Sequence, residues 1–225
     1  MRALASGDAW CRDWSDHGLP FFFLPPGPPV TAAGADPKSS RTARPAIPRP
    51  GRTIALVGLM GVGKSTVGRR LAHRVDLPFV DGDEAIETAA RMTVSEIFAR
   101  LGEAEFRAGE ARVMRRLLEA PPVVLATGGG AVLNADTRAL MKTRATTVWL
   151  RADLKIVAAR VQRRDTRPLL RGKDPLQALT AMAEVRYPLY ETADVIVDVG
   201  AGAHGQAVEA ILAALTDYWT REMDT

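Results

Sequence analysis

The feature that most constrains this chain is the segment 58–66, which reads Gly-Leu-Met-Gly-Val-Gly-Lys-Ser-Thr. It has the complete G-x-x-x-x-G-K-[ST] spacing of a phosphate-binding loop, or P-loop. Residues 53–57 before it are apolar and β-prone, and Val67, Leu71 and Val75 recur at helical spacing behind it. A glycine-rich turn of chance composition is the alternative, but such a turn needs no strand before it and no helix after it. The segment therefore predicts an α/β domain that binds a nucleotide.

The residue types of this loop suit a polyphosphate. Glycines at 58, 61 and 63 let the backbone bend so that successive N–H groups point inward and form a nest for an anion. The helix that starts near Lys64 adds its unpaired first-turn N–H groups and the positive end of its dipole. We expect Lys64 to reach the outer phosphates and Ser65 to place its hydroxyl on Mg2+.

The composition fits one soluble catalytic domain with some additional chain. The 225 residues are 47% hydrophobic and 25% charged. Because 30 basic and 26 acidic residues leave a net charge of only +4, the balance does not argue for a nucleic-acid partner. The single cysteine, Cys11, excludes an internal disulfide framework and a cysteine-based metal site.

Residues 1–50 differ in kind from the rest. They are rich in proline and have few periodic apolar positions, so we expect a mostly disordered extension before a domain at 51–220. The apolar run at 19–24 is far too short to span a bilayer, and no membrane segment is expected elsewhere.

Apolar, β-prone runs alternate with helical patterns after the loop. Strands are predicted at 77–80, 123–127, 146–150 and 195–197, and helices at 84–90, 93–102, 106–118, 153–162, from 175 onward and at 207–218. This alternation predicts a three-layer α/β/α fold with a five-stranded parallel sheet and right-handed crossovers.

Two carboxylates, Asp81 and Asp83, follow the strand predicted at 77–80. In an open parallel sheet this end of the strand lies beside the P-loop, where ligands bind. Asp83 could simply cap the helix that starts at Glu84. Alternatively, one carboxylate holds Mg2+ through water, and the other accepts a hydrogen bond, or the proton, from a substrate hydroxyl.

Three further stretches could face the same crevice. Gly128-Gly129-Gly130 ends the strand predicted at 123–127, and successive glycines permit close approach to a ligand. Thr127 stands where an ordinary Walker B strand has an aspartate, so metal ligation must rely on Ser65 and the Asp81–Asp83 pair. Arg107 lies on a predicted helix, where an arginine is usually solvated. A loop at about 162–174 carries Arg163, Arg164, Arg167 and Arg171 and is typical of a positively charged lid.

In this order the motifs resemble those of the shikimate kinases. They are the P-loop, Asp81-Gly82-Asp83, Glu105-Phe106-Arg107, Gly128-Gly129-Gly130, Arg167-Pro168-Leu169-Leu170 and Arg186-Tyr187-Pro188-Leu189-Tyr190, and the resemblance covers about residues 52–218. It implies the small kinase fold of nucleoside monophosphate kinases with a mobile lid. It also implies Mg2+-dependent transfer of the ATP γ-phosphoryl group to the 3-hydroxyl of shikimate.

The resemblance implies a role for each matching residue. Arg107 and Arg186 would bind the shikimate carboxylate, and Asp83 would bind ring hydroxyls and act as the base. Asp81 would lie near the metal, which it reaches through water. Lys64, Asp83 and Arg167 would be the catalytic residues. ATP would contact Gly61, Val62, Gly63, Lys64, Ser65, Thr66, Arg160 and Arg167, and shikimate would also contact Phe98, Phe106, Glu110, Gly128, Gly129, Gly130, Pro168 and Leu169.

One departure and two alternatives remain. The family often has a basic residue after the fifth strand near the adenine, whereas residues 198–203 offer none. The alternatives are another small-metabolite kinase, such as a gluconate kinase, and a catalytically silent nucleotide-binding module. We expect a cytoplasmic monomer that binds ATP and shikimate, with no nucleic-acid or membrane partner.

Overall fold

Five parallel strands form the centre of the domain. The computed structural model describes residues 51–162, 174–200, 202 and 204–223. The strands are β1 (Thr53–Val57), β2 (Phe79–Asp81), β3 (Val124–Ala126), β4 (Ala145–Arg151) and β5 (Val195–Asp198), in the order β2-β3-β1-β4-β5. All four pairings are parallel, which confirms the predicted sheet.

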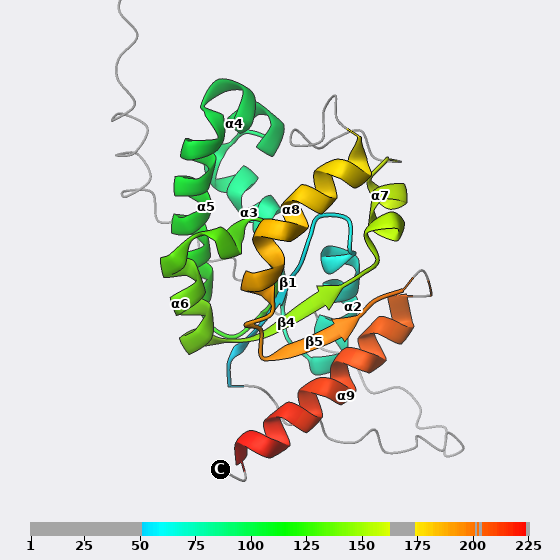
Figure 1. Ribbon diagram of the computed structural model, residues 1–225. Helices are drawn as coiled ribbons and strands as arrows, with labels where there is room; N and C mark the ends of the chain where they lie inside the picture. Colours follow the sequence, from blue (N-terminus) through cyan, green and yellow to red (C-terminus); the bar gives the residue numbers. More distant parts are fainter. Residues whose placement is uncertain (1–50, 163–173, 201, 203, 224–225) are drawn as a thin grey trace, which may run out of the picture. The chain divides into compact units, whose positions relative to one another are not determined.

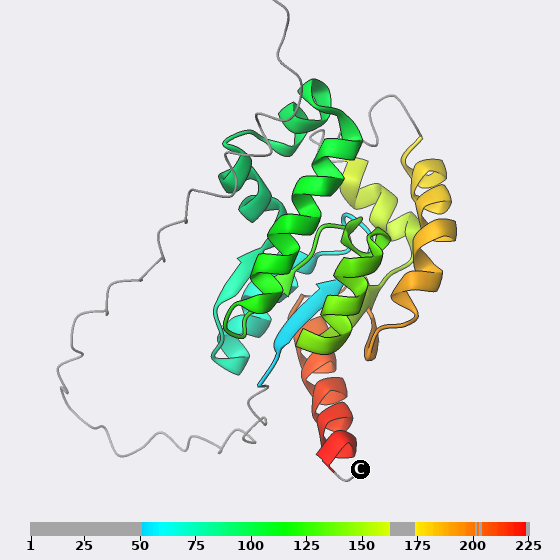
Figure 2. The ribbon, with the colours of Figure 1, turned by 90° about the vertical axis from the view of Figure 1, so that its left-hand side faces the viewer.

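Helices cover both faces of the sheet (Figures 1 and 2). They are α2 (Lys64–Val75), α3 (Gly82–Ala90), α4 (Val94–Arg100), α5 (Gly102–Glu119), the 3-10 turn η1 (Ala131–Leu133), α6 (Ala135–Arg144), α7 (Leu154–Gln162), α8 (Pro175–Tyr190) and α9 (His204–Met223). Helices α2 and α9 pack on one face, and α5, α6 and α8 lie on the other. The central strands β1 and β3 are buried at every position, as expected for a sheet covered on both sides.

The order of the strands brings three motifs together at the carboxyl ends of adjacent strands. The P-loop follows β1, Asp81 ends β2, and Gly128–Gly130 follow β3, which lies between those two strands. Asp81 pairs in register with Ala126, and Ala126 pairs with Leu56. The carboxyl ends of the three strands therefore deliver their loops to a common crevice, as predicted.

The structure corrects two predictions about helix ends. Helix α3 begins at Gly82, so Asp83 lies inside its first turn and does not cap it. The cap is Asp81, whose Oδ1 accepts a hydrogen bond from the Asp83 backbone N–H at 3.0 Å. Helix α5 begins at Gly102 instead of Phe106, because Gly102 takes a left-handed φ of 84° that lets the chain turn from α4 directly into α5.

Helix α6 was not predicted. It buries only Thr137 and Met141, so it lacks a continuous apolar stripe, and its start depends on the Asn134 side chain, which accepts a hydrogen bond from Thr137 N–H.

The extension at 1–50 and most of the predicted lid, with Arg167, Pro168 and Leu169, lie outside the described residues. No helix among the described residues is long and apolar enough to cross a membrane.

Candidate functional site

The P-loop has the geometry that the sequence predicts. Gly61 and Gly63 have φ values of 81° and 102°, which side chains with a Cβ rarely adopt, and α2 begins immediately afterwards at Lys64. The Lys64 side chain is buried, and its Nζ donates hydrogen bonds to the carbonyl oxygens of Gly58 at 2.8 Å and Leu59 at 3.0 Å. The ammonium group therefore lies over the loop itself. Ser65, on the first turn of α2, is partly exposed and accessible to a ligand.

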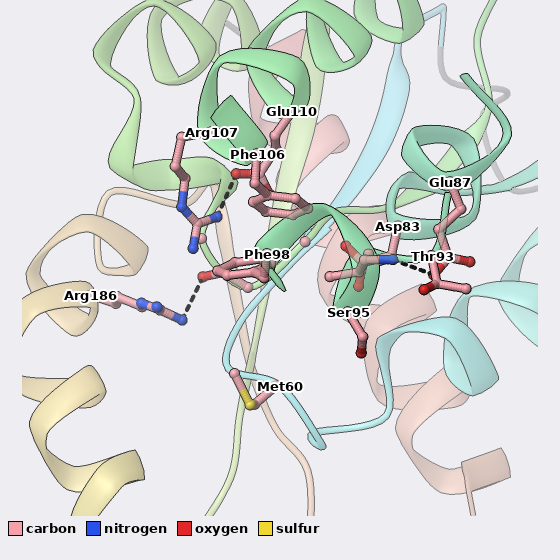
Figure 3. A pocket seen from close by; sticks show the side chains of 14 residues that line it. Met60, Asp83, Glu87, Thr93, Ser95, Phe98, Phe106, Arg107, Glu110 and Arg186 are labelled. Carbon is pink, nitrogen blue, oxygen red and sulfur yellow. Dashed lines mark hydrogen bonds and ion pairs between the residues drawn. The ribbon is translucent and has the colours of Figure 1, made fainter. Parts of the chain in front are cut away.

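A pocket of about 450 Å³ lies between the P-loop, the glycine segment 128–130, the helices α3 to α5 and Arg186 of α8 (Figure 3). Its lining residues are Met60, Asp83, Glu87, Thr93, Val94, Ser95, Phe98, Phe106, Arg107, Glu110, Gly128, Gly129, Gly130 and Arg186. All nine of the substrate-contact residues that were predicted within the described part of the chain line this one pocket. Met60 belongs to the P-loop, so the pocket adjoins the predicted phosphate site.

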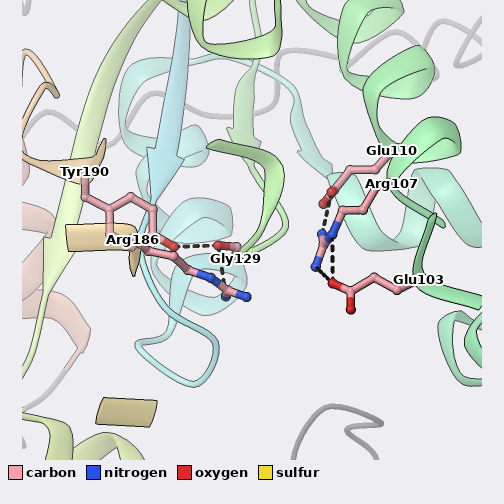
Figure 4. Close-up of polar contacts among 6 residues, drawn as sticks. All are labelled: Glu103, Arg107, Glu110, Gly129, Arg186 and Tyr190. Atoms are coloured by element: carbon pink, nitrogen blue, oxygen red, sulfur yellow. Dashed lines mark hydrogen bonds and ion pairs between the residues drawn. The ribbon is translucent and has the colours of Figure 1, made fainter. Parts of the chain in front are cut away.

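Arg107 is held at one side of the pocket. Its Nη1 donates to Glu110 Oε2 at 2.6 Å, and its Nη2 donates to Glu103 Oε1 at 3.2 Å (Figure 4). The guanidinium carbon lies 5.0 Å from the centre of the Phe106 ring. Its guanidinium also packs on Gly130, where no Cβ could be accommodated without displacing it. Arg107 is thus a pocket residue and not the solvated helix arginine that its position alone would suggest.

Arg186 lies on α8 and is only 6% exposed. Its Nη1 donates to the carbonyl oxygen of Gly129 at 3.2 Å, and the Tyr190 hydroxyl donates to the same oxygen at 2.6 Å. Burial raises the pKa of the Tyr190 hydroxyl above its ordinary value, which extends the pH range over which it can donate this hydrogen bond. These two bonds fasten the glycine loop to α8 and bring Arg186 to the pocket that Arg107 also lines.

Glu110 is a buried carboxyl group, 3% exposed, beside Arg107. Burial raises its pKa, and the adjacent Arg107 opposes that shift by favouring the ionised form. Its Oε1 has no hydrogen-bond partner among the described residues. A Cβ on Gly128 would lie 2.5 Å from this oxygen and 2.9 Å from Asp83 Oδ1, so the carboxyl groups of Glu110 and Asp83 both approach Gly128.

Five lining residues were not predicted: Met60, Glu87, Thr93, Val94 and Ser95. Thr93 is the first residue of the helix predicted at 93–102, and it forms a capping box with Glu96: Thr93 Oγ1 accepts a hydrogen bond from Glu96 N–H, and the Glu96 carboxylate accepts one from Thr93 N–H. A helix start placed between two motif-bearing segments could have indicated that this turn faces the ligand. Glu87 could also have been predicted to line the pocket, because it lies four residues after Asp83 and so on the same face of α3.

The donor atoms near the P-loop fit Mg2+, which prefers hard oxygen ligands and retains several waters. Ser65 supplies a hydroxyl, and Asp81 supplies a carboxylate at the end of β2. Asp81 uses Oδ1 to cap α3, which leaves Oδ2 for a bound water. The Thr127 hydroxyl donates a hydrogen bond to the carbonyl oxygen of Leu56 at 3.0 Å, and this bond connects the end of β3 to β1.

The predicted adenine side is formed by α7 and the chain after β5. Arg160 Nη2 donates to the carbonyl oxygen of Gly200 at 2.9 Å. Asp198, the last residue of β5, accepts hydrogen bonds from Arg151 at 2.6 and 2.8 Å and is thus paired with a cation from β4. The charge of Arg151 is therefore matched by Asp198, and Arg160 is the basic residue whose side chain contacts the chain after β5.

Together the P-loop, the parallel sheet and the adjacent charged pocket define a phosphotransferase of the P-loop class. Comparison with known proteins identifies the family. The shikimate kinase family model matches residues 60–216. A shikimate kinase from Caulobacter vibrioides is 60% identical over 164 residues, which cover 73% of this chain and 82% of that protein. A shikimate kinase from Bradyrhizobium diazoefficiens is 45% identical over 201 residues, or 89% of each chain.

The fold agrees with this match. A solved shikimate kinase from Acinetobacter baumannii, in complex with shikimate, superposes with a TM-score of 0.73 at 36% identity and covers 75% of this chain and 95% of its own. The chain therefore belongs to the shikimate kinase family.

Proposed function

We propose that this chain transfers the γ-phosphoryl group of ATP to the 3-hydroxyl of shikimate, giving shikimate 3-phosphate and ADP on the route to chorismate and the aromatic amino acids. The observation that supports this most directly is the pocket beside the P-loop, lined by two arginines and by the carboxylate of Asp83. Such a pocket suits a small ring that carries both a carboxylate and hydroxyl groups.

Arg107 and Arg186 would bind the substrate carboxylate. Both line the pocket, they come from different helices, and both are orientated by hydrogen bonds before any ligand arrives. Charge-assisted hydrogen bonds of this kind contribute about 1.5 to 3 kcal/mol each. Phe98 and Phe106, whose ring centres are 4.7 Å apart, would cover the apolar part of the ring.

Asp83 would bind the ring hydroxyls and act as the base. It lies on the first turn of α3, at the carboxyl ends of the strands, where the P-loop also lies. Gly129 would offer its backbone N–H. The preceding carbonyl, that of Gly128, accepts a hydrogen bond from Ala131 N–H at 3.1 Å. Because C=O and N–H point in opposite directions across a trans peptide, this bond fixes the direction of the Gly129 N–H.

On the nucleotide side, ATP would be bound by residues 61–66, with Lys64 moving from the loop carbonyls to the phosphates. Mg2+ would be held by Ser65 and, through water, by Asp81; when bound it neutralises phosphate charge. Arg160 would pack on the adenine, and Arg167 of the lid would reach the transferring group. A loose phosphoryl transition state requires alignment and charge stabilisation more than a strong base, so Lys64 and Arg167 should contribute at least as much as Asp83.

The relatives also bear on the alternatives. Those reported above, 45 to 60% identical, are shikimate kinases and not gluconate kinases, and Lys64, Ser65 and Asp83 are intact, which disfavours a silent nucleotide-binding module. We further propose that the protein acts as a cytoplasmic monomer.

The test is ADP release from ATP and Mg2+ with shikimate, quinate or gluconate offered separately, using the full chain and a chain that lacks residues 1–48. We expect turnover with shikimate alone in both. Bound ATP without turnover of shikimate would overturn the proposal and favour the silent module, and turnover with gluconate would favour the other kinase.

A further inference from the structure

Glu87 connects two helices that form one wall of the pocket. It lies on α3, one turn after Asp83, and its Oε1 accepts a hydrogen bond from the backbone N–H of Val94, the first residue of α4, at 2.8 Å (Figure 3). The bond is partly buried and spans seven residues of chain. Since the first N–H groups of a helix have no partner within it, Glu87 satisfies a group that α4 itself leaves open.

The rest of α4 is anchored on a different helix. Its Phe98 ring lies 4.7 Å from the Phe106 ring of α5, and α5 begins immediately after α4 ends. Ile97 is buried, with 1% of its surface exposed. The capping box of Thr93 and Glu96 closes within the first turn and does not reach α3. The far end of α4 is therefore fixed on α5, whereas Glu87 ties its beginning to α3.

These two attachments carry different parts of the pocket. Helix α3 supplies Asp83 and α4 supplies Ser95 and Phe98, all of which line it. The distance between the carboxylate of Asp83 and the aromatic wall thus depends on how α3 and α4 are held together. Helix α4 has only seven residues, so its N-terminal turn is a large part of the element.

We propose that Glu87 is a positioning residue for the acceptor substrate: it holds the start of α4 against α3 and so sets the width of the pocket between Asp83 and Phe98. The inference rests on the proposed function, because it takes shikimate to be the substrate of this pocket. Glu87 acts through the Val94 N–H. Its role requires a hydrogen-bond acceptor at this position and does not require a negative charge.

The test compares Glu87→Ala with Glu87→Gln, because glutamine keeps an acceptor oxygen and loses the charge. We expect Glu87→Ala to raise the shikimate KM about fivefold, the change that corresponds to one lost hydrogen bond, with the ATP KM and kcat within about twofold of wild type. The Glu87→Gln enzyme should have a shikimate KM within about twofold of the wild-type value. The matched control is Glu84→Ala, which removes a carboxylate from the same helix where it pairs with Arg69 on the surface.

The results distinguish a failure of the positioning role of Glu87 from a failure of the proposed kinase activity. Wild type that fails to phosphorylate shikimate overturns the proposed function. Wild type that is active while Glu87→Ala keeps a normal shikimate KM overturns only the positioning role. A Glu87→Gln enzyme as impaired as Glu87→Ala would show that the charge matters, which also overturns it. Thermal melting of each variant shows whether it is folded, and a KM change shared equally by ATP and shikimate would indicate general loosening and count against the proposal.

Discussion

Arg107 and Glu110 form an ion pair inside the pocket, with Nη1 and Oε2 2.6 Å apart, while the other carboxyl oxygen of Glu110 has no hydrogen-bond partner among the described residues. The pair lies on one helix at a spacing of three residues, and only the arginine is accessible, since the glutamate side chain is 4% exposed and the arginine side chain 23%. Arg107 is therefore held in place before a substrate carboxylate arrives, which reduces the entropy lost on binding.

The first prediction concerns this arginine. Arg107→Ala should raise the shikimate KM about 10- to 100-fold, because a charge-assisted bond to the substrate is lost, and should change kcat much less. Arg107→Lys should recover little of the affinity, since an ammonium cannot reproduce the planar donor geometry. Steady-state kinetics with shikimate varied at saturating ATP measures both parameters. Arg115→Ala, on the exposed side of the same helix, is the control, and a normal KM in Arg107→Ala would contradict the carboxylate assignment.

The second prediction concerns the P-loop lysine. Lys64 Nζ lies 2.8 Å from the Gly58 carbonyl oxygen. Lys64→Met keeps the length of the side chain and removes the charge that would stabilise the phosphates, so kcat should fall about 10²- to 10³-fold with a nearly unchanged shikimate KM. Lys142→Met, an exposed position on α6, should leave both parameters unchanged. Arg167→Ala should likewise lower kcat more than it raises the shikimate KM.

Much of this site could be predicted from the sequence because its motifs are contiguous. The P-loop, the Asp81–Asp83 pair and the three glycines each follow a strand, and parallel strands bring such segments to one edge. What could not be predicted depends on side-chain contacts between elements. The choice of Asp81 over Asp83 as the cap is decided by where α3 starts, and a shift of two residues at the start of the helix reverses it. Glu87 resembles any polar residue of an amphipathic helix until α4 is placed beside it.

The third prediction is a pH dependence. Because burial raises the pKa of Glu110 in the folded chain, the folded state holds a proton that the unfolded state has already released. The free energy of unfolding should therefore fall, through this group, as pH rises from about 4.5 through the folded-state pKa. Glu110→Gln cannot titrate, so the stability of wild type relative to this variant should decrease across that window.

Melting temperatures of both proteins at pH values from about 4 to 8 measure the difference. Glu119→Gln, an exposed change at the end of the same helix, controls for the effect of removing a carboxyl group. If the difference between wild type and Glu110→Gln does not vary with pH while the enzyme remains folded, the ion pair with Arg107 fully compensates for burial of the carboxyl group.

The last prediction concerns the close approach at Gly128. A Cβ there would lie 2.5 Å from Glu110 Oε1 and 2.9 Å from Asp83 Oδ1, so Gly128→Ala must displace both carboxyl groups. Overpacking of this kind costs about 1 to 3 kcal/mol, which corresponds to a decrease of several degrees in Tm for a domain of this size. Because Asp83 is the proposed base and Glu110 holds Arg107, the shikimate KM should rise and kcat should fall together. Gly205→Ala is the matched control, since nothing lies within 4 Å of a Cβ at that helical position, and it should be neutral or slightly stabilising. A Gly128→Ala enzyme with unchanged Tm and kinetics would show that the two carboxyl groups can separate freely, and that their positions around this glycine do not limit catalysis.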